Sequence, residues 1–436
     1  MNRREISRLQ ATKLRVLLKE VAVSNDFYRE KLRGFGWEAS VADESADLES
    51  LLGQLPLTTK QEVQESVESA GPYGRVLTYP VERYCRLHQT SGTTGRPLRW
   101  LDTPESWEWI IDCWGQIFRA VGVKESDRFF FPFSFGPFLG FWSAYEAAAR
   151  RGHFVLPGGG LRTRARLNLL VENAANIVVC TPTYALNMAT VARAAGIDLR
   201  ASPVKLLIVA GEPGGNVAAT KARLESEWGA RCCDHSGMTE VGPYGVEALS
   251  EPGDLYVLED EFIVEALVPG SEDTVADGEC GELVITGLGR VGSPLLRYRT
   301  GDLVRWTKKP GAALPFGRLL GGVLGRLDEM FIVRGNNVYP SAIENVVRQF
   351  PEIDEYRIRV QDTGSLANLV IEIEPAQASG ADAAGVGDDT DELVERVREA
   401  TEKELLFRAE VRAVPAGTLP KFELKGKRIV RESHVV

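Results

Sequence analysis

The chain has 436 residues, of which 44% are hydrophobic and 26% charged, with a formal net charge of −10. This length is too great for one ordinary hydrophobic core and allows two or three domains. The composition is typical of a globular protein, and the acidic balance argues against a general nucleic-acid binder.

No apolar run approaches the roughly 18 residues of a membrane span, and the first residues lead into no apolar signal segment. Six cysteines are scattered along the chain without paired metal-binding spacing. Such usage is typical of free thiols in a reducing compartment.

The N-terminal third is predicted to be mainly helical. Apolar residues at helical spacing predict one helix over residues 4–33. In the segment 55–60, Thr58 or Thr59 is the expected N-cap of the next helix. A further amphipathic helix is predicted over 104–121. We expect these helices to pack in the hydrophobic core and to carry no catalytic or binding residues.

Residues 88–97 read His-Gln-Thr-Ser-Gly-Thr-Thr-Gly-Arg-Pro. Glycines allow backbone N–H groups to approach a ligand closely, hydroxyls add short donors, and the Arg96 guanidinium suits phosphate oxygens. The stretch therefore indicates a clamp for the phosphates of a nucleotide. A polar surface turn is the alternative, because Ser, Thr and Gly favour turns, and the P-loop spacing is missing.

An unusual aromatic stretch runs from residue 129 to residue 142. Phe129 to Phe131 are predicted to form a buried strand. Beyond Pro132, prolines and glycines interrupt any regular element, and aromatic side chains held in such a segment tend to line a cavity.

The middle of the chain alternates short apolar runs with helical patterns, which predicts parallel strands with helical crossovers. The predicted elements are strand 153–157, helix 161–174, strand 177–181, helix 184–194 and strand 204–210. Ligands bind at the carboxyl ends of such strands. Two glycine-containing loops, 210–215 and 234–242, are expected at these ends.

From residue 251 to residue 305 the pattern changes to β-type, and a small α+β region ends the chain. The predicted elements are strands 255–258, 262–264 and 281–286, helix 341–350, strands 356–360 and 368–373, helix 391–406 and strand 409–414. Ser341 and Glu344 have the spacing of a capping box. The Ala-, Gly- and Asp-rich loop 376–390 is expected to be mobile.

Three separate motifs carry a resemblance to a known family. They are the loop 88–97, the Tyr-Arg-Thr-Gly-Asp run at 298–302, and the Leu-Pro-Lys…Glu-x-Lys-Gly pattern at 419–426. Together they resemble the adenylate-forming superfamily, and nearly the whole chain is most similar to its phenylacetate–CoA ligase family. One departure is Arg96, which stands where this loop usually has lysine.

The resemblance implies an α/β fold of the adenylate-forming type. A large N-terminal domain, residues 1–327, would combine α/β layers with a β-barrel-like part and bind ATP and acid. A small mobile α+β domain, residues 328–436, would carry the catalytic lysine. Asp328 would be the hinge between them.

The resemblance also implies the nucleotide-binding residues. The phosphate loop would be formed by Ser91, Gly92, Thr93, Thr94, Gly95 and Arg96, and the loop over adenine by Gly211, Glu212 and Pro213. The adenine and metal motif would contribute Asp234, His235 and Ser236. Asp302 would bind the ribose, and Arg326 would contact ribose or phosphate. His235 or Ser236 stands where the family commonly has tyrosine.

Three residues would carry the reaction. Glu240 would ligate Mg²⁺, which prefers carboxylate and phosphate oxygens, and Thr239 would contact the α-phosphate. Lys425 would be the adenylation lysine, with Lys421 and Lys427 as the other candidates.

The acid-binding pocket is the remaining part of the expected site. Its wall residues would be Phe135, Phe138, Gly140, Phe141, Trp142, His235 and Gly237. An aromatic wall favours an aryl or arylacetyl acid. The role of His235, as a pocket wall, a polar contact or a structural residue, is left open.

The implied enzyme is an ATP-dependent, AMP-forming acid–thiol ligase that uses ATP, Mg²⁺ and CoA. It would be cytoplasmic and homodimeric, with no nucleic-acid or membrane partner. The alternatives are an adenylating enzyme with another acceptor, such as an amine, a carrier protein or nitrite in diazo formation, and a silent relative that only binds. Many relatives place zinc-binding cysteines near 248–251 and 313–317, where this chain has none, so we expect no structural zinc.

Overall fold

The computed structural model describes residues 1–35, 46–90, 97–333, 336–362, 367–376, 386–405, 407–423 and 425–432. The predicted phosphate clamp, residues 91–96, lies outside the described residues, as do residues 377–385 of the low-complexity loop. In the described ranges, no helix is long and apolar enough to cross a membrane.

The chain divides into two units, each built from two stretches of sequence. Unit 1 comprises Met1–Gly159 and Cys233–Val323, and unit 2 comprises Gly160–Cys232 and Leu324–Val436. The domain boundary expected between residues 327 and 328 stays a prediction.

Unit 1 contains an N-terminal helical part and a strand-rich part. Its helices are α1 (Arg3–Ser24), α2 (Asp26–Gly34), α3 (Leu48–Gly53), α4 (Lys60–Ala70), α5 (Pro104–Ala120), α6 (Leu139–Arg150) and the 3₁₀ turn η2 (Val81–Arg83). Its strands, counting those that lie mainly in it, are β1 (Arg86–Gln89), β2 (Arg99–Asp102), β3 (Arg128–Phe131), β4 (Phe154–Pro157), β7 (Arg231–Met238), β8 (Gly242–Ala248), β9 (Glu251–Val257), β10 (Phe262–Leu267), β11 (Cys280–Gly287), β12 (Tyr298–Thr307) and β13 (Arg318–Arg326).

The strands of unit 1 pair in three groups. β10, β11, β12, β13, β9, β8 and β7 are neighbours in that order, with antiparallel pairing between β7, β8 and β9 and between β10, β11 and β12. β3 and β4 are parallel, and β1 and β2 form a separate antiparallel pair on either side of residues 91–96. The predicted change to β-type sequence after residue 250 is confirmed.

Unit 2 combines α/β crossovers with a small α+β part. Its elements are α7 (Thr163–Glu172), β5 (Ile177–Cys180), α8 (Pro182–Ala194), β6 (Leu206–Ala210), α9 (Ala218–Trp228), β14 (Phe331–Val333), β15 (Asn336–Val338), α10 (Pro340–Val347), β16 (Ile353–Asp362), β17 (Ala367–Pro375), α11 (Val386–Leu405), β18 (Glu410–Ala413) and β19 (Ile429–Glu432). β5 and β6 are parallel, as predicted.

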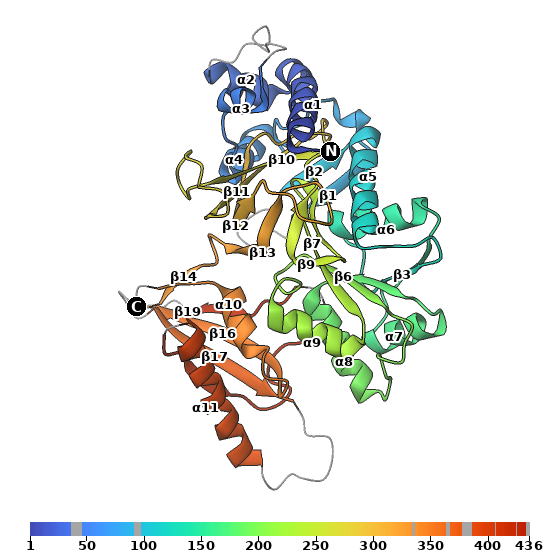
Figure 1. Cartoon of the computed structure of the whole chain (residues 1–436), viewed down its shortest axis with the longest axis vertical. Coiled ribbons are helices and arrows are strands. Elements are labelled where there is room, and N and C mark those ends of the chain that lie inside the picture. Colours follow the sequence, from blue (N-terminus) through green and yellow to red (C-terminus); the bar gives the residue numbers. More distant parts are fainter. Residues whose placement is uncertain are drawn as a thin grey trace. The chain divides into compact units, whose positions relative to one another are not determined.

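The C-terminal part of unit 2 has its own core. Its sheet has the order β18-β17-β16-β19, and α10 and α11 pack on it through buried residues such as Ile343, Leu393 and Val397. Figure 1 shows α11 running beside this sheet. α10 also contacts α9, which joins this part to the crossover helices. The α/β fold class expected from the sequence is confirmed.

Several local predictions need correction. The helix expected over 4–33 is broken at Asn25, which ends α1 and caps α2 by accepting a hydrogen bond from the Tyr28 N–H at 3.0 Å. The break follows from side-chain hydrogen bonds to free N–H groups, which apolar periodicity does not report. Of the two N-caps expected for the next helix, Thr58 and Thr59, the structure confirms Thr59, which caps α4 and forms a capping box with Glu62.

The capping box predicted at Ser341 and Glu344 is wrong. Tyr339 is the N-cap of α10 and makes no side-chain cap. The Ser341 hydroxyl donates to the carbonyl oxygen of Leu324 at 2.8 Å, and Glu344 accepts from Thr220.

The helix expected to start at residue 391 begins at Val386, so residues 386–390 of the predicted mobile loop are helical.

Candidate active site

The predicted adenine and metal motif lies at the junction of β7 and β8 in unit 1. Asp234, His235, Ser236 and Gly237 lie on β7, because the strand continues to Met238 and pairs antiparallel with β8. The loop expected over 234–242 is therefore shorter than predicted. Its turn, residues 239–241, ends at Gly242, whose positive φ of 101° favours glycine.

Arg290 holds this turn from the side. Its Nη1 donates to the carbonyl oxygens of Thr239 at 2.6 Å and Glu240 at 3.0 Å. Its Nε and Nη2 donate to the two carboxylate oxygens of the buried Asp102 at 2.6 and 2.7 Å. Burial opposes ionisation of Asp102, but the charge and hydrogen bonds of Arg290, together with His88, outweigh it and lower the pKa of that carboxyl.

This arrangement connects two predicted site segments within unit 1. Asp102 ends β2, the strand that follows residues 91–96. Through Arg290 it fixes the main chain of Thr239 and Glu240. Neither Asp102 nor Arg290 was predicted from the sequence, because an ion pair between residues so far apart leaves no local pattern.

His235 is buried and neutral. Its Nδ1–H donates to the carbonyl oxygen of Gly245 at 2.7 Å, and its ring lies 4.4 Å from the Trp114 ring. Burial lowers the pKa of His235 to about 4, against which the hydrogen bond to Gly245 acts only weakly. Nε2 therefore carries a lone pair and can accept a hydrogen bond.

The aromatic stretch forms a connected cluster in unit 1. Phe133 stacks on Phe141 at 4.1 Å, Phe135 lies 4.8 Å from Trp142, and Phe138 lies 5.8 Å from Phe141. Phe135, Phe138 and Phe141 are half-buried and Trp142 is 37% exposed, whereas Phe129, Phe130 and Phe131 are fully buried in β3. The partly exposed rings leave faces free for an apolar ligand.

Asp302 lies on β12 beside Gly301, whose φ of 76° bends the strand. Asp302 is buried, and its N–H donates to the Thr300 hydroxyl. The predicted ribose contact is thus placed on a strand and not in an exposed turn.

The predicted site residues that belong to unit 2 lie around the end of β6. Gly211 has a φ of 95°, and a Cβ placed on it would lie 3.4 Å from Cε of Lys425. Glu212 accepts from the N–H of Thr183 at 2.9 Å and from the N–H of Gly426 at 2.6 Å. The structure therefore brings the predicted adenine loop and the predicted lysine together within unit 2.

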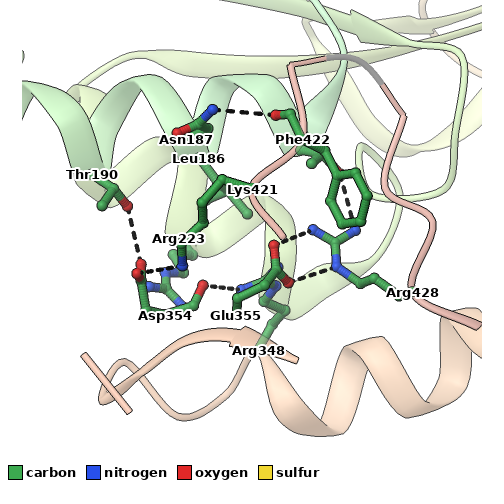
Figure 2. Close-up of a pocket in the computed structure, with 11 residues that line it drawn as sticks. Leu186, Asn187, Thr190, Arg223, Arg348, Asp354, Glu355, Lys421, Phe422 and Arg428 are labelled. Carbon is green, nitrogen blue, oxygen red and sulfur yellow. Dashed lines mark hydrogen bonds and ion pairs between the residues drawn. The ribbon is translucent and has the colours of Figure 1, made fainter. Parts of the chain in front are cut away.

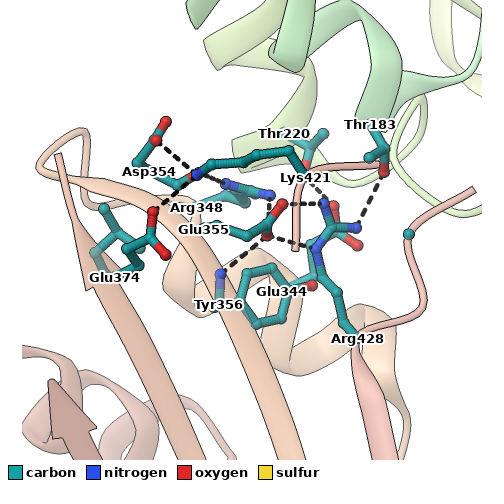
Figure 3. Close-up of polar contacts among 12 residues, drawn as sticks. Thr183, Thr220, Glu344, Arg348, Asp354, Glu355, Tyr356, Glu374, Lys421 and Arg428 are labelled. Atoms are coloured by element: carbon teal, nitrogen blue, oxygen red, sulfur yellow. Dashed lines mark hydrogen bonds and ion pairs between the residues drawn. The ribbon is translucent and has the colours of Figure 1, made fainter. Parts of the chain in front are cut away.

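Lys421 has different surroundings. Its Nζ lies 2.7 Å from Asp354 and 3.0 Å from Glu374 (Figure 3). Burial opposes its charge, but these two carboxylates raise the pKa of Lys421 above its ordinary value.

Arg326 and Asp328, also in unit 2, pair with each other at 2.9 Å on an exposed surface.

Glu240 fits a magnesium ion that is shared with a nucleotide. Mg²⁺ is usually held by one or two carboxylates, substrate phosphates and water, and Glu240 offers one half-buried carboxylate on a fixed turn. Within the described ranges, no three His, Cys, Asp or Glu residues are grouped so as to hold a metal without a substrate.

The sequence and the fold were compared with known proteins. Residues 335–432 match the family model of the AMP-binding enzyme C-terminal domain. A solved structure of 2-hydroxyisobutyryl-CoA ligase in the postadenylation state, in complex with R3-HIB-AMP, superposes with a TM-score of 0.90 at 26% identity over 99% of this chain and 90% of that one. The same ligase with 2-HIB-AMP and CoA in the thioesterification state gives a TM-score of 0.72 at 27% identity over 99% and 91%.

These features define an AMP-forming acyl-CoA ligase. The phenylacetate–coenzyme A ligase of Pseudomonas putida is 31% identical over 84% of this chain and 81% of its own length. The corresponding Escherichia coli K12 enzyme is 29% identical over 99% and 96%. The chain belongs to the phenylacetate–coenzyme A ligase family, which confirms the family, fold and enzyme class expected from the sequence.

Proposed function

We propose that the chain activates an aryl or arylacetyl acid with ATP and transfers the acyl group to CoA. The cofactors are ATP, Mg²⁺ and CoA. The observation that carries the proposal is the position of Lys425 beside Gly211, in a chain similar to phenylacetate–CoA ligases over 99% of its length.

In the first step a carboxylate oxygen of the acid attacks the α-phosphorus of ATP. A carboxylate–phosphorus bond forms as the bond to pyrophosphate breaks, and negative charge increases on the phosphoryl oxygens. Catalysis of such a step is mainly positioning and electrostatic stabilisation. Lys425 and Thr239 supply donors, and the predicted phosphate loop 91–96, which lies outside the described residues, would add backbone N–H donors. Glu240 would hold Mg²⁺, which would neutralise phosphate charge.

The nucleotide base and ribose are assigned to the remaining residues. Gly211 and Pro213 face adenine, Asp302 accepts from the ribose hydroxyls, and Arg326 contacts ribose or phosphate. Asp234, His235 and Ser236 complete this assignment on β7. In the second step the CoA thiolate attacks the acyl carbon and AMP leaves with the electron pair of the cleaved bond, after the small domain has turned at Asp328.

The acid class is argued from the aromatic cluster. Phe135, Phe138, Phe141 and Trp142, with Gly140 next to them in the sequence, are the proposed apolar wall. His235 and Gly237 are the proposed polar wall. Burial of apolar surface stabilises a bound ligand by roughly 25 cal/mol per Å². A flat ring should therefore be preferred over acetate or an amino acid.

The experiment measures ATP-dependent pyrophosphate release with benzoates, phenylacetates, cinnamates and short fatty acids, each with and without CoA, and with nitrite in place of acid. The Lys425→Ala variant is the inactive control. We expect an aryl acid to give the highest kcat/KM and a thioester to form only with CoA. Pyrophosphate release with nitrite, and no thioester from any acid, would overturn the proposal in favour of diazo formation.

The assembly and the location are also proposals. The family resemblance supports a homodimer and a cytoplasmic location, and the described structure forms no disulfide among the six cysteines, in keeping with a reducing compartment. Light scattering at assay concentration should give twice the mass of one chain, and a monomer would contradict the homodimer.

A further inference from the structure

The catalytic-lysine segment is attached to the crossover part of unit 2 at several points. Asn187 on α8 donates through Nδ2 to the carbonyl oxygen of Phe422 at 3.2 Å (Figure 2). The Phe422 ring lies 5.8 Å from the Arg428 guanidinium. These contacts border a small cavity of about 20 Å³, which is too small for a nucleotide or an acid.

The Glu212 side chain binds the main chain of the catalytic-lysine segment. One carboxylate oxygen, Oε1, accepts from the N–H of Thr183 at 2.9 Å, and the other, Oε2, accepts from the N–H of Gly426 at 2.6 Å. Burial raises the pKa of Glu212, although Arg428, Thr183 and Gly426 oppose this rise. Glu212 is half-buried, and a carboxylate with little water around it depends on its protein donors, because unpaired charge in such a place is costly.

Arg428 fixes the other side of Gly426. Its Nε and Nη2 donate to the two oxygens of Glu355 at 2.7 and 3.0 Å, and its Nη1 donates to the Thr183 hydroxyl at 3.0 Å (Figure 3). Arg428 is 8% exposed. A Cβ on Gly426 would collide with the guanidinium of Arg428, which would have to move, so glycine allows this close approach.

We propose that Glu212 and Arg428 are positioning residues that hold Lys425 for the adenylation step. They fix the main chain on the C-terminal side of Lys425, and the aliphatic part of Lys425 lies beside Gly211. The inference rests on the proposed function. It gives Glu212 a different role from the nucleotide contact predicted from the sequence, and the two roles have different kinetic consequences.

The first test compares Glu212→Gln with wild type in the two half-reactions. Gln keeps the size of the side chain but offers one acceptor oxygen where the structure uses two. We expect kcat for ATP–pyrophosphate exchange to fall about 10- to 100-fold, since small misplacements of a catalytic group have such effects. KM for ATP and the rate of thioester formation from a supplied acyl-adenylate should stay within about twofold of wild type.

The matched control is Glu423→Gln, which makes the same charge change on the segment that carries Lys425. Glu423 is exposed and its carboxylate lies 3.5 Å from Arg166, whereas the Gly426 N–H donates to Glu212, so both half-reactions should be unchanged. A rise in KM for ATP with an unchanged kcat in Glu212→Gln would overturn the inference and support a nucleotide contact. Equal loss in both half-reactions would also overturn it. If Glu212→Gln does not fold, Glu212→Asp, which keeps the charge but is shorter, takes its place.

The second test needs no activity. Amide hydrogen exchange of a peptide that contains Gly426 should be faster in Glu212→Gln and in Arg428→Lys than in wild type and Glu423→Gln. Unchanged exchange in both variants would overturn the inference. A wild-type enzyme that releases no pyrophosphate with any acid would refute the proposed function instead, and the exchange experiment would still decide whether Glu212 and Arg428 hold the segment.

Discussion

Lys421 and Lys425 lie on one segment but have different neighbours. Lys421 is paired with Asp354 and Glu374, whereas Lys425 is exposed and its Cε lies near Gly211. A cation that already neutralises two carboxylates has less charge to offer a phosphoryl group. This difference supports the assignment of Lys425, which sequence alignment by the following glycine suggested.

Lys425→Ala is expected to lower the rate of ATP–pyrophosphate exchange by about 10²–10³ or more, as the loss of one preorganised donor does. Conversion of a supplied acyl-adenylate to thioester should be retained. Lys421→Ala is the comparison variant and should keep pyrophosphate exchange. The opposite result, with exchange lost in Lys421→Ala and kept in Lys425→Ala, would contradict the assignment.

His235 is expected to make stability depend on pH. Its pKa is about 4 in the folded protein and 6.5 for the free side chain, so below pH 6.5 the unfolded chain binds the proton more readily. The stability that comes from keeping His235 neutral is therefore fully present above pH 6.5 and is lost as the pH falls towards 4. Between pH 7 and pH 4.5, His235 should lower the free energy of unfolding by about 2 kcal/mol.

His235→Asn keeps an N–H donor for Gly245 but does not titrate in this range. Urea denaturation at pH 7 and pH 4.5 should show a smaller loss of stability in this variant than in wild type, because all carboxylates contribute equally to both proteins. Equal losses would contradict a buried neutral His235. The chain has only four histidines, so NMR titration can follow this ring directly.

At the scale of elements, Asn25 shows why one predicted helix became two. Its side chain is fully buried, donates to the Val76 carbonyl oxygen at 2.8 Å and to the Thr78 hydroxyl at 3.1 Å, and caps α2. Asn25→Ala should lower the free energy of unfolding by about 2–4 kcal/mol, since it removes a cap and leaves buried acceptors without donors.

Asn2→Ala is a matched control, because Asn2 caps α1 on the exposed surface. Its cost should be about 1 kcal/mol. Thermal or urea unfolding of both variants tests the difference. Equal costs would mean that the buried hydrogen bonds of Asn25 contribute little.

The turn between β7 and β8 depends on Arg290. Arg290→Lys keeps the charge but loses the fork that binds both Asp102 and the turn. We expect a rise in KM for Mg·ATP, because the main chain of Thr239 and Glu240 is no longer held, and a loss of about 2–4 kcal/mol in stability.

Arg297→Lys separates these two effects. Arg297 is also buried, and it donates to both oxygens of Glu265 and to the Leu55 carbonyl oxygen. This control should lose comparable stability with an unchanged KM for Mg·ATP. A KM that is the same in Arg290→Lys as in wild type would show that the turn holds its shape without Arg290.

Helices with strong periodicity, such as α5, the strand runs of the crossover region and the family motifs could be read from the sequence. Partners such as Glu212 and Gly426, or Asp102 and Arg290, could not, because their hydrogen bonds join residues remote in sequence. The capping box at Ser341 failed for the same reason, since both side chains have tertiary partners.

For the molecule as a whole, the absence of cysteines near 248–251 and 313–317 predicts a protein without structural zinc. Elemental analysis of purified protein should find much less than one zinc per chain, and Mg²⁺ should be needed only together with ATP. Near-stoichiometric zinc would refute this prediction.

The interleaving of the two units affects how the chain can fold during its synthesis. α1, α2 and α3 share a core with Ile263, Leu288 and Leu296, which leave the ribosome only after the whole of residues 160–232 of unit 2. At usual elongation rates the apolar faces of the first helices therefore wait on the order of tens of seconds for their partners. During that interval the nascent chain presents an unfinished core, which makes it a substrate for chaperones that bind exposed apolar segments.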